Sequence, residues 1–299
     1  MRTKKIIVVT GPTATGKTVF TIRLAAHFNS EIISADSRQF YRKMNIGTAK
    51  PSMQEQAAVP HHFIDFLNPD EDYNIGRFES DALQLVSELF QKHDSVFVTG
   101  GSGLYIKTLC EGIDELPEAN ESIRTELMRE WKENGLQSLQ DKLQKEDPEY
   151  FQIVDLNNPH RILRALEVIQ LSGKPYSSFR TQSKKIRSFD IYKIALLIDR
   201  DELYERINKR VDSMMEKGLL EEVRTLLPYR NTNALQTVGY REFFEYFDGK
   251  ISLSDAINLV KQNTRHYAKR QMTWMRKQED LHWVEADEID EVIHRLEEE

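Results

Sequence analysis

Short runs of Ile, Val and Leu recur along the chain, separated by segments in which apolar residues follow helical spacing. A continuous apolar run of this kind is typical of a buried strand in a parallel sheet. Such strands are predicted at residues 5–10, 31–35, 94–99 and 192–198, with shorter ones at 61–66 and 281–284. Amphipathic helices are predicted at 17–28 and 76–92. This alternation predicts an α/β fold with a parallel sheet flanked by helices.

The pattern changes after Pro117, where the chain becomes charged and helix-forming. Helices are predicted at 121–131, 136–145 and 159–171. Because a strand returns near residue 192, we interpret residues 117–189 as an all-helical insertion into one core formed by 1–116 and 190–299. Further helices of the core are predicted at 201–216, 219–227, 240–247 and 253–277, with an acidic helix closing the chain.

The clearest chemical motif follows the first predicted strand and satisfies the G-x-x-x-x-G-K-[ST] pattern of a phosphate loop. At a strand-to-helix junction, the backbone amides and the positive end of the helix face the phosphates. Lys17 can reach the outer phosphate oxygens, and the Thr18 hydroxyl can ligate Mg²⁺. The alternative is a glycine-rich turn with a surface lysine, but the context favours a P-loop NTPase-like core. The loop consists of Gly11, Pro12, Thr13, Ala14, Thr15, Gly16, Lys17 and Thr18.

Two further polar segments follow predicted strands. Asp36 lies just after the second strand, and Gly100-Gly101-Ser102 follows the strand at 94–99. Ligands of open α/β sheets bind at the carboxyl ends of the strands. We therefore expect Asp36 to stand beside the phosphate loop, about one strand spacing away.

Composition excludes several classes of protein. The chain is 39% hydrophobic and 30% charged, and it has no run of about 18 apolar residues that would predict a membrane span. A single cysteine, Cys110, excludes a disulfide framework or a cysteine-rich zinc site. The N-terminus lacks the features of a secretory signal, so a cytoplasmic location is expected. His61 and His62 would point to opposite faces of a strand, which argues against a metal site there.

The net charge of −7 at first argues against a nucleic-acid partner, but the charge is unevenly distributed. Between Asp255 and Glu279 there is no acidic residue. Lys261, Arg265 and Lys269 are spaced to share one helical face in this window. A basic face attracts polyanions, so we expect it to contact RNA, the alternative being an ordinary solvated surface.

Most phosphate-loop enzymes hydrolyse or transfer a phosphoryl group and carry a second acidic residue at the end of an apolar strand. Here the strand at 94–99 ends in Gly-Gly-Ser instead. The residues thus indicate a diphosphate-binding loop without the usual acidic partner. A small-molecule or nucleotide kinase and an RNA-binding protein switched by a nucleotide stay open as alternatives.

Several segments together resemble the bacterial tRNA dimethylallyltransferases (tRNA isopentenyltransferases), and the resemblance spans nearly the whole chain. The segments are the phosphate loop, Asp36-Ser37-Arg38-Gln39, residues 45–51, 100–105, 158–167, 210–214, 236–242 and 264–271. One departure is Ser102, where the family usually has threonine; the hydroxyl is retained.

This resemblance implies transfer of a dimethylallyl group from dimethylallyl diphosphate to N6 of adenosine 37, next to the tRNA anticodon, with Mg²⁺ as cofactor. Lys17 would stabilise the departing diphosphate together with the loop, Thr18-bound Mg²⁺ and Arg210, although Arg210 is about as well explained as a helix-surface ion pair. Asp36 would be the general base, with Ser102 beside it. The anticodon stem-loop would be the partner of a monomeric enzyme. The residues implied in tRNA binding are Asp36, Ser37, Arg38, Gln39, Ser102, Arg124, His160, Arg161, Arg164, Gln236, Gly239, Tyr240, Arg241, Arg265 and Lys269.

Overall fold

The computed structural model describes residues 3–181, 183–278 and 280–298, and the chain forms two compact units. The core unit comprises residues 1–111 and 187–299, and the helical unit comprises Gly112–Ile186. The sequence predicts the helical insertion at 117–189, whereas the compact unit spans a segment that begins and ends a few residues earlier. Within the described ranges, no helix is long and apolar enough to cross a membrane.

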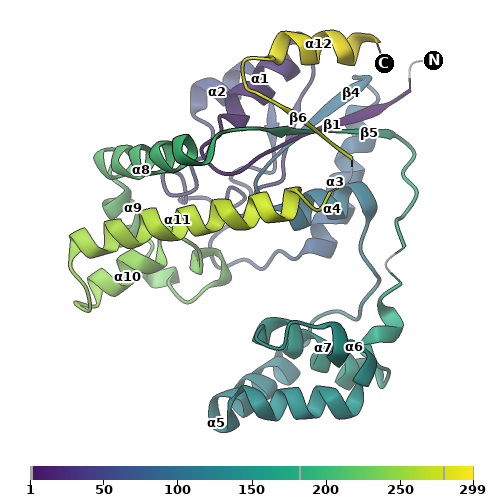
Figure 1. The fold of residues 1–299 in the computed structure, drawn as a ribbon, viewed down its shortest axis with the longest axis vertical. Helices are drawn as coiled ribbons and strands as arrows, with labels where there is room; N and C mark the ends of the chain where they lie inside the picture. Colours follow the sequence, from purple (N-terminus) through teal and green to yellow (C-terminus); the bar gives the residue numbers. More distant parts are fainter. Residues whose placement is uncertain (1–2, 182, 279, 299) are drawn as a thin grey trace. The chain divides into compact units, whose positions relative to one another are not determined.

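The core unit is built on a six-stranded parallel sheet, which confirms the predicted fold class (Figure 1). The strand order is β3-β2-β4-β1-β5-β6. The strands are β1 (Lys5–Thr10), β2 (Ile32–Ser34), β3 (His61–His62), β4 (Ser95–Thr99), β5 (Asp190–Leu196) and β6 (Leu281–Val284).

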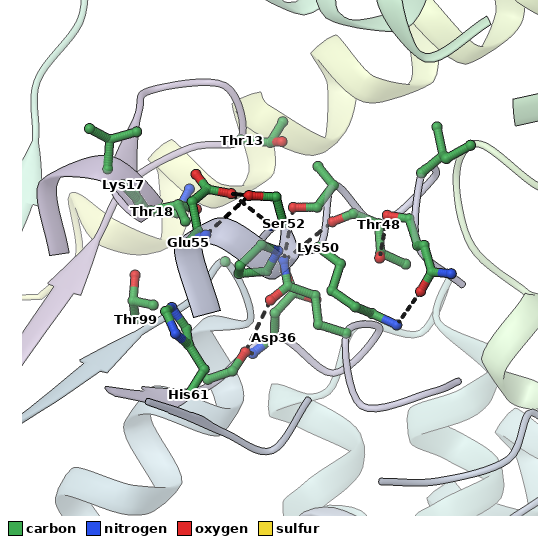
Figure 2. A pocket seen from close by; sticks show the side chains of 18 of the residues that line it. Thr13, Lys17, Thr18, Asp36, Thr48, Lys50, Ser52, Glu55, His61 and Thr99 are labelled. Atoms are coloured by element: carbon green, nitrogen blue, oxygen red, sulfur yellow. Dashed lines mark hydrogen bonds between the residues drawn. The ribbon is translucent and has the colours of Figure 1, made fainter. Parts of the chain in front are cut away.

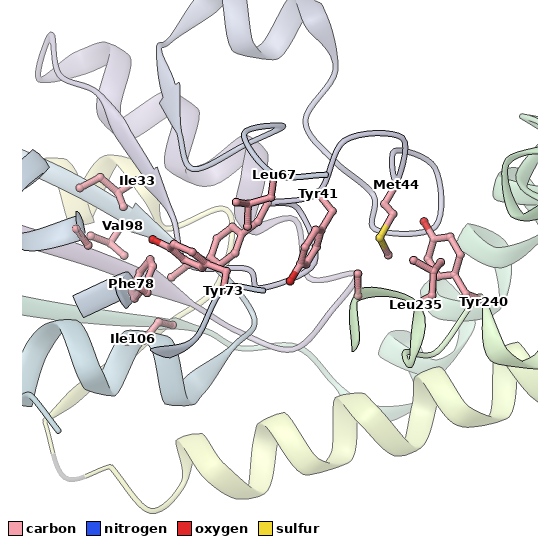
Figure 3. Close-up of a cluster of buried hydrophobic side chains, with 14 of the residues drawn as sticks. Ile33, Tyr41, Met44, Leu67, Tyr73, Phe78, Val98, Ile106, Leu235 and Tyr240 are labelled. Atoms are coloured by element: carbon pink, nitrogen blue, oxygen red, sulfur yellow. The ribbon is translucent and has the colours of Figure 1, made fainter. Parts of the chain in front are cut away.

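Helices cover both faces of this sheet because its central strands are apolar on both sides. Ile7 and Val9 of β1 pack in one cluster with α1 (Lys17–His27) and α12 (Ile289–Glu298). Ile6 and Val8 face the opposite layer, where Phe78 of α3 is fully buried (Figure 3). That layer contains α3 (Ile75–Leu89), α4 (Gly103–Glu111), α8 (Arg200–Glu216), α9 (Leu219–Thr225), α10 (Arg241–Phe247) and α11 (Leu253–Met275).

The helical unit has its own hydrophobic core. It contains α5 (Glu121–Glu146), α6 (Pro148–Ile153) and α7 (Pro159–Ser172), followed by a short 3₁₀ turn at Tyr176–Phe179. Leu139 and Leu143 of α5 pack with Ile162 and Leu166 of α7. Gly135 interrupts α5 with a positive φ of 79°, so the segment is two helices joined at a kink, as the spacing of apolar residues predicts.

The strand order corrects one expectation. β4 pairs with both β1 and β2, so Asp36 follows a strand two positions from the phosphate loop, not one. The segment after β2, which carries Asp36, lies close to the segment after β4. This close approach depends on Gly100, immediately after β4. A Cβ there would lie 2.4 Å from the Ala35 carbonyl oxygen, and only glycine leaves that space free.

The strand predicted at 61–66 is also shorter than expected. β3 contains only His61 and His62, because Phe63 and Asp65 adopt left-handed φ values of 59° and 55° and turn the chain away from the sheet. A short helix, α2 (Met53–Ala58), precedes β3 and begins with a capping box between Ser52 and Glu55.

Arg187 anchors the chain where it re-enters the core unit. Its Nε donates to the Leu109 carbonyl at 2.9 Å, and its guanidinium donates to the Thr108 carbonyl and to Glu79, each at 2.8 Å. Both members of the Arg187–Glu79 pair are buried to about nine-tenths. The re-entry point is therefore held against the last turn of α4.

Candidate active site

The phosphate loop connects β1 to α1 in the conformation its sequence predicts. Gly16 has a left-handed φ of 91° immediately before the helix, a conformation that glycine adopts without strain. The Pro12 carbonyl accepts hydrogen bonds from the Thr15 hydroxyl at 2.9 Å and from Lys17 Nζ at 2.8 Å. These bonds close the loop around its own backbone and hold the lysine along it.

The loop forms part of the wall of a cavity of about 760 Å³ (Figure 2). Thr13, Lys17 and Thr18 line it from the loop, Asp36 lines it from the turn after β2, and Arg210 lines it from α8. The segment between β2 and β3 contributes Ile46, Thr48, Ala49, Lys50, Ser52 and Glu55, and β3 contributes His61. Cations and polar groups therefore surround a space large enough for a diphosphate ester.

Electrostatic coupling links three charged groups of this cavity. Burial, together with the nearby Arg210 guanidinium, lowers the pKa of Lys17 to about 7, while Asp36 opposes the shift. Burial also lowers the pKa of Arg210, against the influence of Asp36. Arg210 donates to the Thr13 hydroxyl at 3.4 Å. The site therefore holds two desolvated cations side by side, an arrangement that a bound polyanion would relieve.

Asp36 lies between this cavity and a second one. Its Oδ1 accepts the Arg38 amide at 3.0 Å, which fixes the turn after β2. The second cavity, of about 120 Å³, shares Thr13, Asp36 and Arg210 with the first and is also lined by Gly239 and Tyr267. The carboxylate therefore faces two adjoining spaces, one of which contains the phosphate loop.

The segment after β4 is hydrogen-bonded to the turn after β2 and is linked through Gln271 to the phosphate loop. Ser102 Oγ accepts the Ser37 amide at 3.1 Å and bonds to the Ser37 hydroxyl at 3.2 Å. Gln271 of α11 donates to the Gly101 carbonyl at 2.8 Å and accepts the Thr13 amide at 2.9 Å. Ser102 is thus adjacent to Asp36, but it is not among the residues that line the two described cavities. No sequence pattern indicates this role for Gln271, because its bridging position depends on how α11 packs.

Of the residues of the core unit that are implied in tRNA binding, some bond to other parts of the protein and others are exposed to solvent. Arg38 donates to the Asn233 carbonyl at 2.8 Å, and the Gln39 side-chain amide to the Thr48 carbonyl at 3.3 Å. Tyr240 is fully buried, and its hydroxyl donates to Glu222 at 2.7 Å; a contact of this position with RNA stays a prediction. The exposed members of this group are Gln236, Arg241 and Lys269.

Helix α11 corrects the expectation of an unbalanced basic face. Lys261 pairs with Asp212 of α8 at 2.6 Å, and Arg265 donates to Asn208 of α8 at 2.6 Å. Periodicity within one helix could not reveal these partners on another. Lys269 and Arg270 are exposed, so the accessible positive charge lies toward the C-terminal half of the helix.

The helical unit carries four residues implied in tRNA binding. Arg124, His160 and Arg161 are exposed. Arg164 donates to Glu167 at 3.0 Å and to the Pro117 carbonyl at 2.6 Å, while Glu167 accepts the Asn120 amide at 2.7 Å. Arg164 therefore fastens the start of this unit to α7.

A phosphate loop at the central strand of a parallel sheet, opening on a cavity lined by Lys17 and Arg210, defines a P-loop protein of the α/β class. The family model for IPP transferase matches residues 39–278. The chain therefore belongs to the IPP transferase family, and it is a transferase.

Relatives match the chain over almost its full length. It is 50% identical to a tRNA dimethylallyltransferase of Christiangramia forsetii, with 95% of this chain and 94% of the relative covered. It is 48% identical to one of Cytophaga hutchinsonii, with 98% and 97% covered.

Solved structures agree with this assignment. A full-length tRNA isopentenylpyrophosphate transferase of Bacillus halodurans superposes with a TM-score of 0.72 at 37% identity, covering 99% of this chain and 96% of that one. A eukaryotic dimethylallyltransferase acting on tRNA gives a TM-score of 0.79 at 28% identity, covering 95% of this chain and 74% of that one.

Proposed function

We propose that this chain transfers a dimethylallyl group from dimethylallyl diphosphate to N6 of adenosine 37 in tRNA, giving N6-(dimethylallyl)adenosine and diphosphate. The observation that carries the proposal is the position of Asp36, which lines both the cavity of the phosphate loop and the smaller cavity beside it. The relatives named as tRNA dimethylallyltransferases support the choice of substrates.

The leaving group would occupy the phosphate-loop cavity. When the allylic C1–O bond breaks, its electron pair goes to the diphosphate, where negative charge develops. Lys17, Arg210 and the loop amides lie where they would stabilise that charge. A lysine whose pKa is about 7 becomes fully protonated beside a diphosphate, because the bound anion favours the charged form.

Mg²⁺ fits this site as a companion of the diphosphate. It is commonly held by one or two protein oxygens, with phosphate oxygens and water completing its shell. The Thr18 hydroxyl lines the cavity and would be the protein ligand, and Asp36 lies along the same cavity. The ion would supply charge neutralisation at the diphosphate. In the described part of the chain, no cluster of His, Cys, Asp and Glu forms a separate metal site.

The acceptor would be activated by Asp36. The exocyclic amine of adenine is a weak nucleophile because its lone pair is delocalised into the ring. As the N6–C1 bond forms, the Asp36 carboxylate would take one of the two N6 protons. The Ser37–Ser102 hydrogen bonds would hold the neighbouring backbone in place.

An adenine extruded from the anticodon loop would enter beside Asp36, since an unpaired loop base is displaced more easily than a paired one. The exposed groups Gln236, Arg241 and Lys269 of the core unit, and Arg124, His160 and Arg161 of the helical unit, would contact the RNA. Since its substrate is tRNA, the enzyme would act in the cytoplasm, and we propose that it does so as a monomer.

The proposal is tested by incubating the protein with an unmodified anticodon stem-loop RNA, Mg²⁺ and dimethylallyl diphosphate. Mass spectrometry should detect addition of one five-carbon group to adenosine 37, and an RNA with guanosine at that position should stay unmodified. ATP-dependent phosphorylation of a metabolite without any RNA adduct would support a kinase instead. RNA binding that changes with ATP or GTP, without either reaction, would support a nucleotide switch.

A further inference from the structure

Glu222 of α9 has an unusual set of hydrogen-bond partners for a helix carboxylate. Its Oε2 accepts the backbone amides of Asn45 and Ile46, at 2.9 and 2.8 Å. Its Oε1 accepts the Gly47 amide at 3.0 Å and the Tyr240 hydroxyl at 2.7 Å. Three successive amides therefore converge on one carboxylate, as they do in backbone nests that bind anions.

The segment held in this way forms part of the active-site wall. Ile46, Thr48 and Ala49 line the phosphate-loop cavity, and Thr48 and Ala49 also line the smaller cavity beside Asp36. Other side chains of the described residues also bond to this segment: the Gln39 amide reaches the Thr48 and Ala49 carbonyls at 3.3 and 3.4 Å, and Lys50 Nζ donates to the Asn45 side chain at 2.9 Å. Glu222 differs from them because it accepts the backbone amides of three successive residues, at 2.8 to 3.0 Å.

Tyr240 completes the arrangement from the loop before α10. A Cβ at Gly47 would lie 2.6 Å from the Tyr240 ring, so the ring packs directly against the Gly47 backbone. The buried hydroxyl then finds its acceptor in Glu222. The Tyr240 ring therefore fixes the position of the Gly47 backbone by packing, and the Glu222 carboxylate orients the amides of residues 45–47 by hydrogen bonding.

We propose that Glu222 is a positioning residue for the transfer reaction: its carboxylate acts as an internal anion that orders residues 45–49 as a wall of the substrate cavity. This proposal rests on the function proposed above. A carboxylate suits the role because hydrogen bonds to a charged acceptor are stronger than those between neutral groups. A glutamine of the same shape turns an N–H₂ donor toward some of these donors and leaves them unpaired.

The test compares Glu222→Gln with the matched control Glu221→Gln, the preceding residue on the same helix, which is exposed and pairs only with Arg224 among the described residues. We expect Glu222→Gln to raise KM for dimethylallyl diphosphate about tenfold and to lower kcat/KM by roughly a hundredfold, the order expected for a misplacement of about 1 Å. The control should match the wild type. Thermal unfolding shows whether each variant is folded at the assay temperature.

A purely structural role makes a different prediction: activity would fall with the folded fraction while KM stays unchanged, and that result would overturn the proposal. Tyr240→Phe, which keeps the ring and the three amide bonds, should change KM less than Glu222→Gln; an equal or larger change would point to Tyr240 as the main support. Equilibrium binding of dimethylallyl diphosphate to the same variants should show the same tenfold difference. It tests the positioning role separately from the wild-type adduct assay, which tests the function.

Discussion

The pKa of Lys17 predicts a pH dependence of substrate binding that can be calculated in advance. Burial and the Arg210 guanidinium lower this pKa to about 7, so the free enzyme loses the ammonium charge as the pH rises through neutrality. The protonated fraction falls from about one half at pH 7 to about one hundredth at pH 9. If only the charged lysine binds diphosphate well, the apparent Kd for dimethylallyl diphosphate rises about 50-fold over that interval.

The ligand itself does not titrate strongly in this range, because the last pKa of a terminal phosphate is about 6. Isothermal titration calorimetry at pH 7, 8 and 9, without RNA so that no turnover occurs, measures the Kd directly. Lys17→Arg is the matched control, since a guanidinium stays charged throughout, and its Kd should be nearly constant. A wild-type Kd that is as flat as that of Lys17→Arg would refute the assignment of Lys17 as the titrating diphosphate ligand.

Three further predictions concern the general base, the surface that contacts RNA, and the packing of Gly100 against Ala35. Asp36→Asn should bind RNA and dimethylallyl diphosphate normally but turn over at least about a hundredfold more slowly in single-turnover assays; near-normal turnover would exclude Asp36 as the base. Lys269→Ala should weaken RNA binding and reduce the slope of log K against log salt by about 1, whereas Lys261→Ala, whose ammonium already pairs with Asp212, should leave that slope nearly unchanged. Gly100→Ala should destabilise the core by about 2 kcal/mol and lower Tm by roughly 5 °C, because its Cβ meets backbone at 2.4 Å; an unchanged Tm in calorimetry would contradict the packing argument.

The parts of the fold that the sequence predicts well are those governed by local rules. The run Ile6–Val9 forms a buried strand, and Gly16 and Lys17 begin a helix where the phosphate-loop pattern requires one. The helical insertion is also evident, because charged helical spacing replaces strand patterns over several tens of residues. Each of these signals lies within one element or at its boundary.

The order of the strands is a different kind of property. Nothing in the local pattern indicates that β4 inserts between β1 and β2, since strand order is decided by packing across the whole sheet. No helix is predicted at α4, because Gly103 and the glycines before it suggest an irregular segment. Gly103 fits the start of this helix because a Cβ there would lie 2.5 Å from the Trp274 ring, a contact with another helix that the local pattern does not indicate.

The site shows the same division between local and long-range information. A motif indicates Lys17, Thr18 and Asp36, but the roles of Gln271 and Glu222 depend on helices that return to the loops from more than a hundred residues away. The counter-charge of Lys261 is likewise on another helix. Partners of this kind have no signature in a single sequence.

The bonds that Arg187 makes to the end of α4 have a consequence for the evolution of the chain. They fasten together the two points at which the helical unit leaves and rejoins the core, so the core unit is held together across the inserted segment. A domain can be inserted or replaced at such a position without changing the fold that surrounds it, because the two chain ends lie close together. The surface of the helical unit can therefore change during evolution without changing the active site of the core unit.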